Sequence, residues 1–334
     1  MSVKEQYKIL TGDCREQLKN YEDNFFDCVV TDPPYGMKID PTWDKDVPTK
    51  DYWEIINQKL KPGGYCLSFC SPRLYHRLAT NIENAGFEIK DQIFWMVTTK
   101  MPRKNKLKQA HEPIVVAQKA LEGTVEKNNK VWGVGKIDTE STRIPWDGEP
   151  PKGWVKGGYK RLAFGKKDKN TKGSGETEGK ENANPAGRYP SNIIGTVAPE
   201  HQKYFYAPRA SKKERGEYND HPTPKPIDLM EYLIRIYTSE NSIILDPFCG
   251  SGSTGIAALQ INRKFVGIDL SEHYCKIAKT RIDERLNTSS SLMKKTKNRK
   301  KGRIVNDIPS QQGERAEASK KTHAGVNKIV GSFV

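Results

Sequence analysis

The chain has 334 residues, enough for one large α/β domain with an insertion or for two smaller domains. Its formal net charge of +15 favours a polyanionic partner, because clustered Lys and Arg release counterions when they neutralise phosphates. Six scattered Cys form no Cys-x-x-Cys pair, no signal peptide opens the chain and no apolar run reaches the ~18 residues of a membrane span, so we expect a cytoplasmic protein with no structural metal and no membrane partner.

Short runs of β-branched and aromatic residues between turn signals predict the strands. In chain order these are Tyr7–Thr11, Phe26–Thr31, Tyr65–Phe69, Gln92–Thr98, Ile114–Ala117, Ser242–Leu245 and Lys264–Ile268. Helical periodicity lies between most of them, at Tyr52–Leu60, Ser71–Ala85, Ser253–Gln260 and Ser271–Arg285. Strands that alternate with helices predict an α/β fold, in which a mostly parallel sheet is covered on both faces.

Two segments depart from this alternation. Between about 121 and 220 the chain is rich in Gly, Pro, Lys and Trp, which predicts an inserted region, and the polar stretch 166–182 within it is typical of a loop. From 287 to 334 the chain carries 11 Lys or Arg against 3 Asp or Glu, which predicts a basic, disordered tail. The predicted regions are therefore 1–120, 121–220, 221–286 and 287–334.

The strand at 26–31 ends in the tetrapeptide Asp32-Pro33-Pro34-Tyr35. Such a strand delivers the carboxylate to the edge of the sheet, the two prolines stiffen the turn, and the aromatic ring can stack on a flat group. The motif therefore indicates a site for an amino group attached to a planar ring. A turn-forming Asp before two prolines is the plainer alternative.

Residues 242–254 form a second motif, which reads as a strand ending in Asp246, a Gly-rich turn and a helix start. A Gly-rich turn lets the backbone approach a ligand closely, and the free N–H groups of a helix start attract an anion. The next strand ends in Asp269, about twenty residues after the glycines, where an acid in Rossmann-like sheets accepts hydrogen bonds from ribose hydroxyls. The expected ligand is a nucleoside that carries an anionic group.

The order of the strands can also be predicted, because the strands missing after Asp269 must come from the N-terminus. We expect strand 7–11 beside the Asp269 strand, and the Asp32 strand on the other side of strand 7–11. This order brings Asp13, Asp32, Asp246 and Asp269 to the carboxyl ends of neighbouring strands, where ligands bind in open α/β sheets.

In this order the motifs resemble the beta class of DNA amino-methyltransferases, which have a Rossmann-like sheet with circularly permuted motifs and use S-adenosylmethionine. The resemblance covers about residues 5–286. The tetrapeptide corresponds to the family's catalytic motif, residues 246–252 to its cofactor motif, and residues 221–226 to the helix-start motif that precedes it. Segments 187–190 and 207–215 also look like segments of phage and bacterial members.

The resemblance implies that the Gly-rich turn and the neighbouring strand ends hold S-adenosylmethionine. Asp269 is expected on its ribose and Asp13 near its adenine. Thr223 and Lys225 are expected on its methionine carboxylate, a role that a cation at a helix start can fill. The full set of expected cofactor residues is Asp13, Cys14, Thr223, Lys225, Asp246, Phe248, Gly250, Gly252 and Asp269.

An exocyclic amine is a poor nucleophile, because its lone pair is delocalised into the ring. If the Asp32 carboxylate and the Pro33 carbonyl each accept an N–H, the lone pair can point at the sulfonium methyl for in-line displacement. Such a pocket requires the target base to flip out of the duplex, where the Tyr35 ring can stack on it. The expected catalytic residues are Asp32, Pro33, Pro34 and Tyr35.

Other residues are candidates for contacts with double-stranded DNA. Trp43 and Asp44 follow the catalytic turn and can form a lid over the flipped base. A cluster of basic residues follows the strand at 92–98 and offers phosphate contacts, with a solvated basic loop as the equal alternative. This cluster comprises Lys100, Arg103, Lys104, Lys106 and Lys108. Target recognition is expected in the inserted region, which holds Trp132, Arg143, Trp146, Trp154 and Arg161.

The resemblance thus implies a site-specific DNA methyltransferase that acts on adenine N6. Family members with Ser in place of Asp32 tend to modify cytosine, which favours adenine here. A cytosine-N4 methyltransferase and a non-catalytic DNA-binding protein of the same fold are the alternatives. A homodimer and a cognate restriction endonuclease are partners that the resemblance allows.

Overall fold

The computed structural model describes the greater part of the chain before residue 300. The described residues are 6–37, 43–97, 104–105, 109–146, 184–195, 218–221 and 223–299, with the backbone alone for 288–299. The chain divides into two units, residues 1–286 and 287–334. All of the strands described below lie in the first unit.

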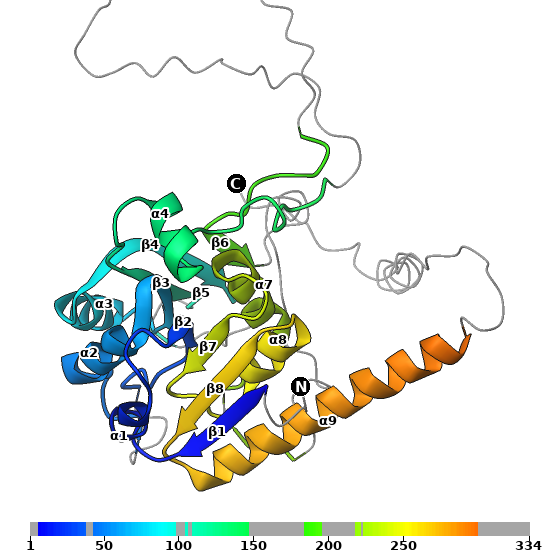
Figure 1. Ribbon diagram of the computed structural model, residues 1–334. Coiled ribbons are helices and arrows are strands. Elements are labelled where there is room, and N and C mark those ends of the chain that lie inside the picture. Colours follow the sequence, from blue (N-terminus) through cyan, green and yellow to red (C-terminus); the bar gives the residue numbers. More distant parts are fainter. Residues whose placement is uncertain are drawn as a thin grey trace, which may run out of the picture. The chain divides into compact units, whose positions relative to one another are not determined.

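Eight strands lie in the described residues: β1 (Tyr7–Thr11), β2 (Phe26–Thr31), β3 (Leu60–Phe69), β4 (Phe87–Met96), β5 (His111–Lys119), β6 (Ile193–Gly195), β7 (Ile243–Asp246) and β8 (Lys264–Asp269). They form one sheet in the order β1-β8-β7-β2-β3-β5-β4-β6 (Figure 1). The five strands from β1 to β3 run parallel, whereas β5 is antiparallel to both β3 and β4. The predicted α/β fold with a mostly parallel sheet is confirmed.

Helices cover both faces of the sheet (Figure 1). The described helices are α1 (Cys14–Gln17), the 3-10 turn η2 (Leu18–Asn20), α2 (Lys50–Lys59), α3 (Tyr75–Asn84), α4 (Val125–Trp132), α7 (Ile227–Tyr237), α8 (Ser253–Gln260) and α9 (Glu272–Arg299). Because successive strand residues point to opposite faces, Val29 packs in the core beneath α2 and α3, while Val30 packs in the core beneath α7 and α8. The sheet therefore has two cores.

The predicted position of the Asp32 strand is wrong. The β2 strand lies between β7 and β3, and β1 lies at the edge of the sheet beside β8, with Thr11 opposite Asp269. All six residues of β2 are buried, which suits a central strand with a neighbour on each side, whereas the half-exposed pattern of β1 suits an edge. The ends of β2 and β7 are consequently adjacent.

Two segments contain more regular structure than predicted. Within 121–220, α4 packs on β3, where buried Asn128 donates to the Pro62 carbonyl at 2.9 Å, and β6 pairs with β4 as the last strand of the sheet. The α9 helix continues to Arg299, so it includes residues 287–299 at the start of the segment predicted to be a disordered tail. The strand β3 also begins at Leu60, directly after α2, so Pro62 and the two following glycines lie in a strand.

Candidate active site

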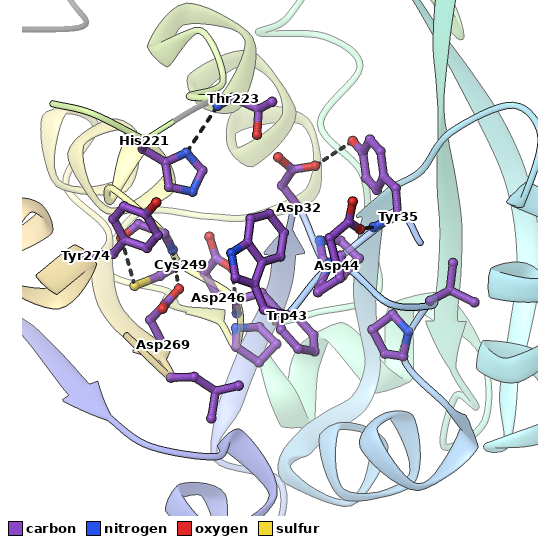
Figure 2. A pocket seen from close by; sticks show the side chains of 18 of the residues that line it. Asp32, Tyr35, Trp43, Asp44, His221, Thr223, Asp246, Cys249, Asp269 and Tyr274 are labelled. Atoms are coloured by element: carbon purple, nitrogen blue, oxygen red, sulfur yellow. Dashed lines mark hydrogen bonds between the residues drawn. The ribbon is translucent and has the colours of Figure 1, made fainter. Parts of the chain in front are cut away.

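A cavity of about 850 Å³ lies at the carboxyl ends of the parallel strands (Figure 2). It brings together the four strand-end acids Asp13, Asp32, Asp246 and Asp269. The predicted site residues that line it are Asp13, Cys14, Asp32, Pro33, Pro34, Tyr35, Trp43, Thr223, Lys225, Asp246, Phe248, Gly250 and Asp269. The two sequence motifs thus meet in one space, although the strand order that achieves this differs from the predicted one.

The Gly-rich turn between β7 and α8 needs glycine at two positions. Gly250 has φ +47°, and a Cβ there would stand 2.7 Å from Nε2 of His221. Gly252 has φ +79°, and a Cβ there would stand 2.9 Å from the Cβ of Ala278. Gly252 caps α8 without a side chain, so the helix presents its first N–H groups openly, as an anion site requires.

Asp269 closes this turn from β8. Its Oδ2 accepts a hydrogen bond from the Gly250 N–H at 2.8 Å and its Oδ1 accepts one from the Ser271 N–H at 2.8 Å. Burial raises the pKa of this carboxyl, and the two backbone donors oppose the rise. Each oxygen keeps a second lone pair, so the carboxylate can still accept bonds from two vicinal hydroxyls.

Asp246, at the end of β7, forms its hydrogen bonds with other residues of the protein. Its carboxylate accepts hydrogen bonds from Thr31 Oγ1 at 2.7 Å, from Thr254 Oγ1 at 2.6 Å and from the Phe248 N–H at 3.2 Å. These bonds join β2, the turn and α8. Burial raises the pKa of Asp246 to about 7, against the opposing effect of these donors.

A hydrophobic wall and a capped helix lie at the β1 side of the cavity. Asp13 caps α1, accepting the Arg15 N–H at 2.8 Å, and pairs with the Arg15 guanidinium, which lies 4.1 Å from the ring centroid of Tyr52. The Phe248 ring packs 5.9 Å from that of Tyr52. Cys14 is buried, and burial raises the pKa of its thiol to about 12, which leaves it an inert apolar contact.

The residues at this end of the cavity fit S-adenosylmethionine. Flat apolar rings suit an adenine, Asp269 suits a ribose, and the open start of α8 suits a carboxylate. The hydroxyl of Ser253, the first residue of α8, lines the cavity, is buried and has no hydrogen-bond partner among the described residues. A buried polar atom without a partner is costly, so a ligand that bonds to it is expected.

The other end of the cavity holds the tetrapeptide that follows β2. The Tyr35 hydroxyl donates to Asp32 Oδ1 at 2.5 Å, and the Lys225 ammonium donates to Asp32 Oδ2 (Figure 2 shows the tyrosine contact). Glu112 on β5 accepts a 3.4 Å bond from the same hydroxyl and lies 3.7 Å from the Lys225 nitrogen. The side chains of Lys225 and Glu112 are only 7% and 12% exposed, so this is a buried ion cluster.

The charges of this cluster act on each other. Burial raises the pKa of the Asp32 carboxyl and the negative charge of Glu112 adds to the rise, while the Lys225 ammonium and the Tyr35 hydroxyl oppose it. Burial alone would lower the pKa of Lys225, but the Asp32 and Glu112 carboxylates raise it above its ordinary value. Lys225 was expected on the methionine carboxylate; here its nearest charged group is Asp32.

The residue expected to form a lid with Trp43 has a different role in this structure. Asp44 is 1% exposed, and its Oδ1 accepts hydrogen bonds from the Tyr35 N–H at 2.9 Å and the Gly36 N–H at 2.7 Å. Its carboxylate therefore supports the turn after β2 from within. Trp43 is half-buried and points into the cavity, as Figure 2 shows.

Sequence analysis missed several residues that line the cavity. Glu112 belongs to a strand predicted to begin only at Ile114, and an acid at the start of an apolar strand was the one signal for it. His221 packs 4.7 Å from the Tyr274 ring; burial and then Lys225 lower its pKa to about 4, so it is neutral at neutral pH. Ser71 has a buried hydroxyl with no partner among the described residues, and Arg73 is exposed.

Most predicted DNA contacts cannot be placed from the described residues. Lys104 is described and exposed. Those that lie outside the described residues are Lys100, Arg103, Lys106, Lys108, Trp154 and Arg161. The described part of the chain contains no cluster of His, Cys, Asp and Glu that could hold a metal ion, and none of its helices is long and apolar enough to cross a membrane.

Comparison with known proteins gives the family. A 74-residue stretch is 47% identical to the type II methyltransferase M2.LlaDCHI of Lactococcus lactis subsp. cremoris, which covers 22% of this chain and 28% of that protein. The DNA adenine methyltransferase YhdJ of Escherichia coli (strain K12) is 24% identical over 305 residues, 89% of each chain. The structure of the cytosine-N4-specific PvuII DNA methyltransferase covers 83% of this chain and 86% of its own, with a TM-score of 0.51 and 17% identity, and so shares the fold.

The family model described as DNA methylase matches residues 26–280, which include both motifs and the elements between them. The family is named for two exocyclic amines, N6 of adenine and N4 of cytosine. Its members transfer methyl groups from S-adenosylmethionine. This chain belongs to the N6/N4 DNA methylase family.

Proposed function

We propose that the protein transfers a methyl group from S-adenosylmethionine to the N6 amine of an adenine flipped out of duplex DNA, in the cytoplasm of a bacterial or phage-infected cell. The observation that carries the proposal is the Asp32 carboxylate, which lies in the same cavity as the Gly-rich turn and Asp269. An acceptor for an amine and a cradle for a nucleoside are thereby within one cavity.

The proposed cofactor residues divide along the cavity. Asp269 accepts the ribose hydroxyls, while Phe248 and Asp13 border the adenine. The start of α8, with the hydroxyl of Ser253, takes the carboxylate, and Thr223 lines the same cavity. When bound, S-adenosylmethionine supplies an electrophilic methyl group on sulfur.

The chemistry at the amine follows from two acceptors. One N–H of the target amine donates to the free lone pair of an Asp32 oxygen and the other to the Pro33 carbonyl, which directs the nitrogen lone pair at the methyl carbon. With the donor bound, an N–C bond would form as its C–S bond breaks, leaving the thioether as product, and the proton of the methylated amine would pass to the Asp32 carboxylate and on to solvent. Tyr35 and Trp43 border this end and offer ring faces for the flipped base.

The choice of adenine rests on two supports. The tetrapeptide begins with Asp32 where family members that modify cytosine tend to carry Ser, and the relative YhdJ, aligned over 89% of the chain, is a DNA adenine methyltransferase.

Exposed Arg73 and Lys104 are further proposed phosphate contacts. A homodimer and a cognate restriction endonuclease are further predictions.

Methylation of DNA followed by nucleoside mass spectrometry tests the proposal. The wild-type protein should produce N6-methyladenine, and Asp32→Ala should lose at least about a thousandfold in kcat because it loses the acceptor. Calorimetry should show that Asp32→Ala still binds S-adenosylmethionine. Glu83→Ala, an exposed position on α3, serves as the surface control and should behave as wild type.

Three results would contradict the proposal. N4-methylcytosine in place of N6-methyladenine would make the protein a cytosine-N4 methyltransferase with the same site. Full activity of Asp32→Ala would remove this residue from the reaction. No methyl transfer and no S-adenosylmethionine binding by the wild-type protein would leave a non-catalytic DNA-binding protein.

A further inference from the structure

The buried cluster around Asp32 contains more charged groups than amine binding requires. Lys225 comes from the segment before α7, Glu112 from β5, and Asp32 and Tyr35 from the turn after β2. The Lys225 nitrogen also lies 5.3 Å from the ring centroids of Tyr35 and Phe69. Three elements that are distant in the sequence thus converge on one ammonium group.

We propose that Lys225 and Glu112 are positioning residues for the methyl-transfer reaction, which together set the charge and the orientation of the Asp32 carboxylate. This inference rests on the proposed function, in which Asp32 accepts the amine. Glu112 and the two rings hold the ammonium group, and the ammonium group holds Asp32. Neither residue needs to touch the base or the cofactor for this role.

The contacts leave room for the amine. Tyr35 donates to Oδ1 of Asp32 and Lys225 to Oδ2, and each of these oxygens has a second lone pair. The pair of donors prevents the carboxylate from rotating, so the remaining lone pairs keep one direction. Pre-orientation of this kind is what an in-line displacement needs.

The balance of charge is as important as the orientation. Asp32 and Glu112 are two carboxylates that share one ammonium group, and the negative charge of Glu112 favours protonation of Asp32. A protonated Asp32 would accept the amine poorly. The ammonium of Lys225 therefore favours the ionised acceptor and Glu112 opposes it.

The other titratable groups around Asp32 do not replace Lys225. The Tyr35 hydroxyl stays protonated because burial and both carboxylates raise its pKa, and Cys70 at the end of β3 stays a thiol because burial raises its pKa to about 12. Asp246, at the end of β7, adds no positive charge. Among the described groups facing Asp32, Lys225 alone supplies a cation.

The test is the pH dependence of kcat/KM for DNA between pH 5 and 9 in two variants that should move in opposite directions. Activity falls on the acid side as Asp32 takes a proton. Lys225→Met removes the cation and should move this acid limb up by about one pH unit, a tenfold loss below the limb. Glu112→Gln removes the opposing charge and should move it down by a similar amount.

A matched control separates this effect from the loss of any buried lysine. Lys59 is also buried and also pairs with an aspartate, Asp23, at 2.6 Å, but it does not line the cavity. Lys59→Met should leave the acid limb in place. The conservative Lys225→Arg keeps the charge and should hold the acid limb close to its wild-type position.

The competing role for Lys225 predicts a different pattern. If its ammonium binds the methionine carboxylate, Lys225→Met should raise the Kd for S-adenosylmethionine tenfold or more and leave the acid limb unmoved, which would overturn the inference. Acid limbs that stay within roughly 0.3 pH unit of the wild-type limb in both variants would also overturn it. If Lys225→Met fails to fold, Glu112→Gln alone tests the inference: a downward shift of its acid limb supports the inference, and an unmoved limb overturns it. A wild-type protein without methyl transfer would instead refute the proposed function.

Discussion

Asp246 and Asp32 are both largely buried acids at the ends of adjacent parallel strands, yet their surroundings differ. Asp246 is 2% exposed and is surrounded by neutral donors, two threonine hydroxyls and a backbone N–H, which belong to the fold. Asp32 is 19% exposed at its side chain and faces a lysine, a glutamate and a tyrosine.

This difference separates the structural half of the site from the half in which we propose that the reaction takes place. Neutral donors satisfy a carboxyl without requiring it to be charged, and burial then raises the pKa of Asp246 to about 7. A cation beside Asp32 favours the ionised form that can accept an amine. Aspartate at neighbouring strand ends thus has two roles: Asp246 stabilises the fold, and Asp32 is the proposed reactive group.

The largest effect that would test this division is expected in the structural half, at the Gly-rich turn. Gly250→Val should weaken S-adenosylmethionine binding on the order of 100-fold, because φ +47° and the 2.7 Å approach of His221 both oppose a side chain. Calorimetry measures the Kd. Gly133→Val is the control, since it has φ +75° with nothing within 4 Å of its Cβ and lies outside the cavity. Unchanged binding in Gly250→Val would separate the turn from the cofactor.

Asp246→Asn should make the stability less sensitive to pH. The folded-state pKa of about 7 lies above the unfolded value of about 3.9, so the folded state holds an extra proton between them and stability is lost as pH rises through this window. From pH 5 to pH 8 the wild type should lose ~2–3 kcal/mol through this residue, a loss that the Asn variant avoids. Urea unfolding at both pH values measures it.

Asp91→Asn, an exposed position on β4, is the control for that experiment. It should leave the pH dependence of the free energy of unfolding as in the wild type. Equal pH dependence of Asp246→Asn and the wild type would mean that Asp246 is ionised in the folded state, and the contrast with Asp32 would disappear.

The smallest of these effects is expected at Asp44, which supports the turn after β2. Asp44→Ala leaves the Tyr35 and Gly36 N–H groups without their acceptor, which should cost ~1–3 kcal/mol of stability. Because Tyr35 and Asp32 shift with the turn, kcat should fall about tenfold. Asp44→Asn keeps an acceptor and should retain most of the activity. If Asp44→Ala keeps a normal kcat but binds DNA more weakly, the result would support the predicted role of Asp44 in a lid over the flipped base.

Local patterns were sufficient for the elements that carry the motifs. The strands at 7–11 and 264–268 and the helix at 253–260 were predicted almost to the residue, because each combines a strong periodicity with clear glycine or acid boundaries. The helix α4 and the short strand β6 were missed. Each depends on a partner from elsewhere in the chain, since β6 exists only by pairing with β4.

The sequence by itself determined which chemistry the chain carries, because an acid at a strand end, a proline-stiffened turn and a glycine cradle are local features of a few consecutive residues. Only the tertiary structure decided which of these features are neighbours. It placed β2 against β7, joined Thr31 to Asp246, and brought Lys225 and Glu112 to Asp32. Such contacts depend on how buried strands select their neighbours and on the desolvation of charges between distant segments, which no local pattern encodes.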